Sequence, residues 1–392
     1  KLGIDAQIIR HGTYKAAVEP LMNEKMSDAN REQLTTLIDG IFGTMLDSIA
    51  IQRNIDRDTL DFIIDEMLIA KDVQLAVKYN VLDGVKYKDE VLEDLKELSG
   101  RPDAKKVRAV SLAEINNTPK KKTHKGLARN KVAVIYAHGD VIMGNDGEGT
   151  IASDRISKAI REARQDSTIK SIVFRVNSGG GSALASEVIW RELKRASEAK
   201  TVIASLGDVA ASGGYYIVAP ADTIMASPTT ITGSIGVFGV IPNMQEFFND
   251  KLGITFDVAK THDHADMYTL SRPLENEERE MIQYGVDKVY KTFTSHVAED
   301  RPLTVDEVDA IGQGRVWNGI DAKRIGLIDM YGGFSDAIEL AAKSAGIEDE
   351  YRVVDLPKLE DPLTVLMKKL SGEVKIRAEK LKWGEAYPYY KQ

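Results

Sequence analysis

The chain has 392 residues, which is enough for two or three domains, and its hydrophobic (43%) and charged (29%) fractions are typical of a soluble globular protein. A net charge of −8 excludes a global basic field that would recruit nucleic acid. The absence of cysteine excludes disulfides, thiolate chemistry and cysteine-ligated metal sites.

The sequence holds no run of about 18 apolar residues, so no membrane-spanning helix is expected within it. It holds no signal peptide either. The chain begins at Lys1 in KLGIDAQIIR, which reads as the middle of a domain. We therefore expect an upstream segment, which could carry a membrane anchor.

The opening residues also belong to an internal repeat. KLGIDAQIIR (1–10) resembles KLGITFDVAK (251–260), MSDANREQL (26–34) resembles LENEEREMI (274–282), and AVKYNVLDGV (76–85) resembles AKRIGLIDMY (322–331). The spacing between the copies drifts by only a few residues, as expected for two copies of one unit with small loop changes. We predict a tandem repeat whose first copy, residues 1–85, lacks its front half.

A linker is predicted over residues 86–130. Its start, YKDEVLEDLKELSG (87–100), is predicted to be helical, and the rest is rich in charge and turn residues. The basic run at 120–125 (KKKTHK) is interpreted as part of this solvated linker rather than as a nucleic-acid or membrane site.

The complete second copy is predicted over residues 131–345. Strands are expected at 131–142, 170–178 and 200–208, alternating with helices at 153–166 and 181–198, and from Glu275 onward the pattern is largely helical. Such alternation indicates βαβ units and an α/β fold with a parallel sheet. Residues 346–392 form a C-terminal extension in which Leu363, Leu366, Met367 and Leu370 have helical spacing, which favours packing on its own domain or on a neighbouring subunit.

Two glycine-rich segments follow buried strands. VNSGGGS (176–182) leaves backbone N–H groups free to face a ligand oxygen, although a tight strand-to-helix turn explains it equally well. GDVAASGGYYIVAP (207–220) places Ser212 before an expected helix, where it is either a nucleophile or a helix-capping serine. Together they favour an acyl-transfer site with an oxyanion hole made by the N–H groups of Gly180, Gly181 and Gly213.

The base that would serve Ser212 is not marked by any local pattern of histidine. None of the six histidines (11, 124, 138, 262, 264 and 296) stands out as a partner, so a serine triad is unsupported. The repeat offers Lys15 instead: the first copy carries this lysine after its strand, whereas the second copy has Ala265 after the equivalent strand, which is expected to end near His264. A single lysine is usually solvated on a surface.

Four segments raise the significance of Lys15: HGTYKAAVEP, VNSGGGSALASEVIWRELK, ASGGYYIVAPADTIMASPTTITGSIGVFG and GRVWNGIDAKRIGLID. Together they resemble signal peptide peptidase A of the long, tandem-repeat bacterial type, over about residues 1–345. The resemblance implies a ββα superhelix of the crotonase and caseinolytic-protease fold group. It also implies a serine peptidase that needs neither a metal nor an organic cofactor.

The resemblance assigns roles to three side chains. Ser212 falls on the nucleophile, Lys15 on its general base, and Ser234 of TGSIG on the serine that hydrogen-bonds the lysine amine. Ala265 stands where short relatives carry their lysine, as the long form requires. Gly179 stands where the family usually has proline, so the oxyanion loop is expected to be more flexible.

The resemblance further implies the substrate and the location. It implies degradation of cleaved signal peptides and other apolar peptides, a groove lined by Leu206, Val237 and Phe238, and a homotetramer around an enclosed cavity. It places an anchored catalytic body on the periplasmic side of the bacterial inner membrane. Two alternatives stay open, a crotonase-like acyl-CoA enzyme and a non-catalytic scaffold that binds peptides.

Overall fold

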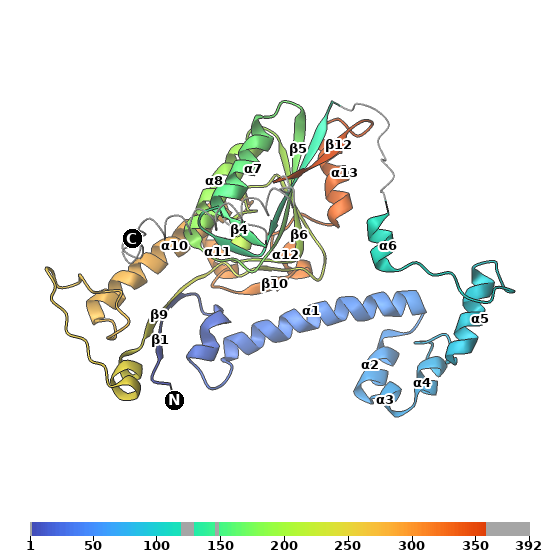
Figure 1. Ribbon diagram of the computed structural model, residues 1–392, viewed down its shortest axis with the longest axis horizontal. Helices are drawn as coiled ribbons and strands as arrows, with labels where there is room; N and C mark the ends of the chain where they lie inside the picture. The colour runs from blue at the N-terminus through green and yellow to red at the C-terminus, as the bar shows by residue number, and fades with distance from the viewer. Residues whose placement is uncertain (1, 119–128, 146–148, 358–392) are drawn as a thin grey trace, which may run out of the picture.

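The computed structural model describes residues 2–118, 129–145 and 149–357 (Figure 1). The basic run at 120–125 and the amphipathic stretch at 363–370 lie outside the described residues. The described chain forms an α/β body from β2 onward, with a helical arm formed by the first hundred residues running beneath it.

The body is built on a mostly parallel sheet, as the sequence predicted. Its main path runs β10-β8-β6-β5-β2-β12, with β7 paired to β6 and β11 to β7; among its described strands, only β10 and β8 pair in the antiparallel sense. The strands are β2 (Lys131–His138), β5 (Ile169–Ser178), β6 (Thr201–Ala211), β7 (Thr223–Ala226), β8 (Ile231–Gly233), β10 (Val316–Asn318), β11 (Met330–Tyr331) and β12 (Arg352–Leu356).

Helices cover both faces of this sheet because its strands alternate two sets of buried apolar side chains. Ala133 and Ile135 face the layer made by α7 (Ser153–Gln165) and α8 (Ala183–Ser197), whereas Val132 and Val134 face α13 (Phe334–Ser344). The body also contains β3 (Asp140–Ile142), β4 (Thr150–Ala152), α9 (Gly213–Tyr216), η2 (Phe247–Leu252), α10 (Asn276–Asp300), α11 (Val305–Ile311) and α12 (Gly319–Arg324).

The leading part of the chain attaches to the body through one strand. β1 (Asp5–His11) pairs in the antiparallel sense with β9 (Val237–Asn243), with His11 opposite Val237. After β1 come η1 (Ala16–Leu21), α1 (Asp28–Arg53), α2 (Arg57–Asp65), α3 (Leu68–Lys71), α4 (Val73–Lys78), α5 (Lys88–Leu98) and α6 (Leu112–Asn117). The helix predicted at the start of the linker is thus present as α5.

The two halves of the proposed repeat begin their long helices at matching positions. Ser27 precedes α1 (26 residues) and Glu275 precedes α10 (25 residues). Two later helices in each half are also capped by a side chain: Asp56 caps α2 and Asp72 caps α4 in the leading part, and Thr304 caps α11 and Asn318 caps α12 in the body. Capping side chains of this kind satisfy the free N–H groups of a first helical turn.

These matched helices differ in how their apolar faces are covered. On α10 the face formed by Val286, Tyr290, Phe293 and Val297 is buried in the body. The matching face of α1 is exposed to between 37% and 60% at Ile38, Phe42, Met45 and Ile49. In the described structure, therefore, the body covers α10, while α1 contacts it mainly at β10.

The structure corrects three sequence-based interpretations. No strand forms at 253–264, the counterpart of β1; the alternating apolar residues Ile254, Phe256 and Val258 are exposed, and a strand needs a partner to persist. β12 pairs with β2, so the sheet continues past the predicted boundary at residue 345. By length and composition α1 is also apolar enough to cross a membrane, with a mean hydropathy of 1.4 over an 18-residue window that is 11% buried.

Candidate active site

Ser212 lies directly after β6, at the start of the short helix α9. Its backbone has φ 53° and ψ −122°, a strained conformation for a residue other than glycine. The conformation is held by a hydrogen bond from Ser212 N–H to the Gly233 carbonyl (2.8 Å), and the Tyr216 N–H donates to the Ser212 carbonyl (2.9 Å). The side chain makes no capping hydrogen bond, which argues against the helix-capping interpretation. A strained serine at a strand-to-helix turn presents its hydroxyl to a substrate.

Lys15 reaches this hydroxyl from a distant part of the chain, the turn that follows β1. The pairing of β1 with β9 carries the turn after β1 to the end of β6, and Lys15 Nζ lies 3.1 Å from Ser212 Oγ. The same amine lies 2.9 Å from Ser234 Oγ and 3.1 Å from the Ser234 carbonyl oxygen. The structure thus brings together the three side chains that the sequence selected.

The surroundings of Lys15 favour its neutral form. The side chain is buried (3% exposed), and this burial lowers the pKa of Lys15 from 10.5 to about 8. A neutral amine has two N–H donors and one lone pair. If the donors face the hydroxyl and carbonyl oxygens of Ser234, the lone pair is left for the proton of Ser212.

A glycine that was not predicted from the sequence lies against the Lys15 side chain. Gly314 has φ +77°, and a Cβ placed there would lie 2.6 Å from Lys15 Cβ. The Tyr14 N–H also donates to the neighbouring Gln313 carbonyl (2.8 Å). The sequence GQG at 312–314 could have indicated a tight turn, but only the fold shows that this turn faces Lys15.

The glycine run approaches Ser212 as predicted, with one difference. A Cβ on Gly180, at φ +107°, would lie 2.7 Å from the Gly213 nitrogen and 2.9 Å from Ser212 Cβ, so only glycine fits here. However, the Gly180 N–H already donates to Ser178 Oγ at 3.0 Å. Among the three glycines, this leaves the N–H groups of Gly181 and Gly213 as the better oxyanion donors.

The three predicted groove residues lie in different environments. Leu206 is 3% exposed and packs in the main core, so it does not line a groove. Val237 is partly buried against the same core. Phe238 is 42% exposed, and the centroid of its ring lies 6.0 Å from Lys15 Nζ. Phe238 is therefore the one of the three that is placed to meet a substrate.

The histidines in the described residues are engaged elsewhere or exposed. His11 binds Asp287 (2.7 Å) and stacks on Tyr290, while His296 stacks on Trp190 and lies 3.1 Å from Glu187. No hydrogen bond from a described histidine to Ser212 is present, consistent with the lack of support for a triad.

One group in the described residues has the composition of a metal site. Ligand atoms of His264, Glu275 and Glu278 lie within 4.8 Å of one another. Arg272 already binds both oxygens of Glu278, at 2.7 and 2.8 Å, which lowers the pKa of that carboxyl to about 2. The group is therefore better explained as an ion-pair cluster around the buried Glu278 than as a metal centre.

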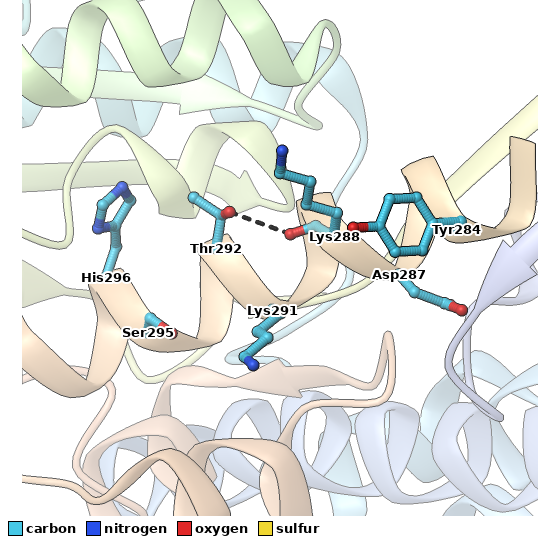
Figure 2. A pocket seen from close by; sticks show the side chains of 7 residues that line it. All are labelled: Tyr284, Asp287, Lys288, Lys291, Thr292, Ser295 and His296. Atoms are coloured by element: carbon cyan, nitrogen blue, oxygen red, sulfur yellow. Dashed lines mark hydrogen bonds between the residues drawn. The ribbon is translucent and has the colours of Figure 1, made fainter. Parts of the chain in front are cut away.

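A pocket of about 570 Å³ lies along α10, apart from the residues around Ser212 (Figure 2). Its described lining is one stretch of that helix, and the hydroxyl of Thr292 is turned inward on its own helix, donating to the Lys288 carbonyl (3.0 Å). The lining residues are Tyr284, Asp287, Lys288, Lys291, Thr292, Ser295 and His296. None of them belongs to the group around Ser212.

Comparisons with known proteins identify the family of this chain. The model of peptidase family S49 matches residues 1–101 and 194–348. The chain is 36% identical to Protease 4 of Salmonella typhi over 96% of its length, 34% to the chloroplastic serine protease SPPA of Arabidopsis thaliana over 95%, and 30% to Protease 4 of Haemophilus influenzae over 98%. It spans 61%, 55% and 64% of these relatives, respectively.

Among solved structures, a ClpP1 mutant from Listeria monocytogenes matches 52% of this chain and 94% of its own. The sequence identity is 15% and the TM-score 0.36. The fold assignment accordingly rests on the parallel sheet and on the family match.

Proposed function

The chain belongs to peptidase family S49, and we propose that it is a serine endopeptidase in which Ser212 is the nucleophile and Lys15 the general base. The observation that carries this proposal is the contact of 3.1 Å between Lys15 Nζ and Ser212 Oγ. It is supported by burial of the amine, because only a neutral lysine can accept a proton at moderate pH.

The proposed reaction follows from this geometry. Ser212 Oγ attacks the carbonyl carbon of the scissile peptide bond while its proton moves to Lys15 Nζ. The negative oxygen of the tetrahedral intermediate accepts hydrogen bonds from the N–H groups of Gly181 and Gly213. The C–N bond then breaks, and Lys15 returns the proton to the leaving amine. Water hydrolyses the acyl-enzyme with Lys15 again acting as the base, which releases the acid and restores Ser212.

Ser234 would orient the base rather than react. Its hydroxyl lies 2.9 Å from Lys15 Nζ and 3.4 Å from the Gly314 carbonyl, to which it can donate. The Ser234 oxygen is then left to accept from the amine, which directs the lysine lone pair towards Ser212.

Labelling with a fluorophosphonate tests the proposal directly, because this reagent needs an activated serine but no knowledge of the natural substrate. We expect labelling at Ser212 that is lost in Ser212→Ala and in Lys15→Ala, with both variants folded. Labelling of folded Lys15→Ala at the wild-type rate would rule out lysine as the base.

We further propose that the substrates are signal peptides and other apolar peptides, degraded at the periplasmic face of the bacterial inner membrane by a homotetramer. The support is the sequence resemblance, together with the exposed ring of Phe238 beside the dyad. Cleavage of an apolar signal peptide but not of a polar peptide of equal length would support the substrate class. Cell fractionation and the mass of the native assembly test the location and the tetramer.

We also propose that the chain is a tandem repeat with an incomplete first copy. Residues 1–85 would be the rear part of a first copy that lends Lys15 to the second, and 86–130 the linker. The matched helix starts support this division, as does the exposed face of α1, which corresponds residue by residue to the buried face of α10. The family match and the dyad contact favour a peptidase over an acyl-CoA enzyme or a scaffold.

A further inference from the structure

A buried carboxylate, that of Glu19, follows Lys15 by four residues in the chain. Glu19 of η1 is 4% exposed and accepts hydrogen bonds from Ser27 Oγ (2.5 Å), Ser27 N–H (3.3 Å) and Asn30 Nδ2 (2.9 Å). Burial raises the pKa of Glu19, but these hydrogen bonds and the charge of Arg10 outweigh it and hold the pKa below its ordinary value. Glu19 is therefore ionised at neutral pH.

Arg10 connects this carboxylate to the catalytic lysine. Its Nη1 lies 4.0 Å from Glu19 Oε1 and donates a hydrogen bond of 3.1 Å to the backbone carbonyl of Lys15. Arg10 belongs to β1, and Ser27 and Asn30 belong to the start of α1. The pair thus fixes the turn that carries Lys15 between a strand and a long helix.

The second copy has a corresponding cluster with the charges reversed. Arg272 binds Glu278 by two hydrogen bonds and Asp266 by two more, each of 2.9 Å. Glu278 occupies the position in α10 that Asn30 occupies in α1, and Asp266 follows Ala265, the counterpart of Lys15. In each copy a buried charged side chain is therefore bound to the start of the long helix beside this turn, but only the turn of the first copy carries a lysine.

We propose that Glu19 and Arg10 are a positioning pair for the general base. They hold the Lys15 backbone so that the Lys15 amine stays in its buried position between Ser212 and Ser234. This inference rests on the proposed function. The other charged groups facing the turn in the described structure are Glu32, Arg315 and Asp287. Glu32 binds Tyr14 and Arg315, Arg315 lies over the Tyr14 ring, and Asp287 binds His11.

Loosening of this turn has a consequence that differs from general destabilisation. If the Lys15 amine leaves its buried position for part of the time, it is better hydrated, and its pKa rises towards the ordinary value of 10.5. The pH at which acylation is half-maximal then moves upward. A purely structural role would lower the fraction of folded protein at every pH and leave that midpoint unchanged.

The experiment follows the rate of Ser212 acylation by a fluorophosphonate against pH, using the full 392-residue chain. In Glu19→Gln we expect the midpoint to rise by about one pH unit and the limiting rate to fall about 3- to 10-fold. Glu278→Gln is the matched control, since it removes a buried charge at the equivalent helix start of the copy without the lysine. We expect a lower melting temperature for it and the wild-type midpoint.

Arg10→Gln covers the case in which Glu19→Gln does not fold, because it leaves the bonds of Glu19 to Ser27 and Asn30 in place. We expect the same upward shift. An unchanged midpoint in the folded variants, or an equal shift in Glu278→Gln, would overturn the positioning role. Failure of the wild-type chain to be labelled, or equal labelling of Lys15→Ala, would instead refute the proposed function, and the inference with it.

Discussion

The amine of Lys15 and the hydroxyl of Ser212 lie 3.1 Å apart although 197 residues separate them in the sequence. The contact depends on β1 pairing with β9, a strand of the body that follows Ser212 in the chain. A base supplied through such a pairing is placed by the fold and by no local motif.

Removal of either member of this pair should abolish peptide cleavage. We expect Ser212→Ala and Lys15→Ala each to lower the rate by about 1,000-fold or more, because the nucleophile and base act as one unit. The double variant should be no worse than either single one. Rates measured on a fluorogenic apolar peptide, with circular dichroism to check folding, would show this; additive losses would argue against a coupled dyad.

The pH dependence of cleavage should report the titration of Lys15. Because burial lowers the pKa of Lys15 to about 8, the neutral base is scarce below that value and predominates above it. We expect the rate to rise about tenfold per pH unit below pH 8 and to level off above it. A flat profile between pH 6 and about 9 in protein that stays folded would contradict a lysine base.

The same burial should make Lys15 costly for stability. The pKa of Lys15 is 10.5 in the unfolded chain and about 8 in the folded chain. The buried lysine therefore lowers the free energy of unfolding in full below pH 8, and this penalty disappears as the pH rises to 10.5. We expect Lys15→Met to raise the free energy of unfolding at pH 7 by up to about 3 kcal/mol. Denaturant titrations at pH 7 and pH 10 should show the gain shrinking with pH.

The glycine run should be sensitive at one position and tolerant beside it. A Cβ on Gly180 would meet the Gly213 nitrogen and Ser212 Cβ within 3 Å, whereas one on Gly179 meets nothing within 4 Å. We expect Gly180→Ala to lower the cleavage rate about 100-fold by displacing the oxyanion donors, and Gly179→Ala to be close to wild type. Equal effects of the two substitutions would show that the loop does not approach Ser212 as described.

The matched faces of the two long helices should differ in their contribution to stability. Phe293 of α10 is 3% exposed, while the corresponding Met45 of α1 is 53% exposed. We expect Phe293→Ala to lower the free energy of unfolding by about 3–5 kcal/mol and Met45→Ala by less than about 1 kcal/mol. A large loss in Met45→Ala would mean that the face of α1 is covered in solution.

Local patterns in the sequence were sufficient for much of the fold. The alternation of strands and helices from residue 131 predicted the parallel sheet because buried strands and amphipathic helices carry different periods of apolar residues. The repeat was misleading at 253–264, where the expected counterpart of β1 forms no strand, because a strand depends on a pairing partner that the similarity of two segments does not supply.

The candidate site divides in the same way. Ser212 and the glycine run were visible because a serine and glycines between a strand and a helix are local features, and Lys15 emerged from the repeat and the family resemblance. Only the tertiary structure shows that Leu206 is a core residue, that the Gly180 N–H donates a hydrogen bond to Ser178, and that a side chain at Gly314 would clash with Lys15. Burial and the free donor of a backbone amide are set by segments far apart in the chain, so no stretch of sequence could specify them.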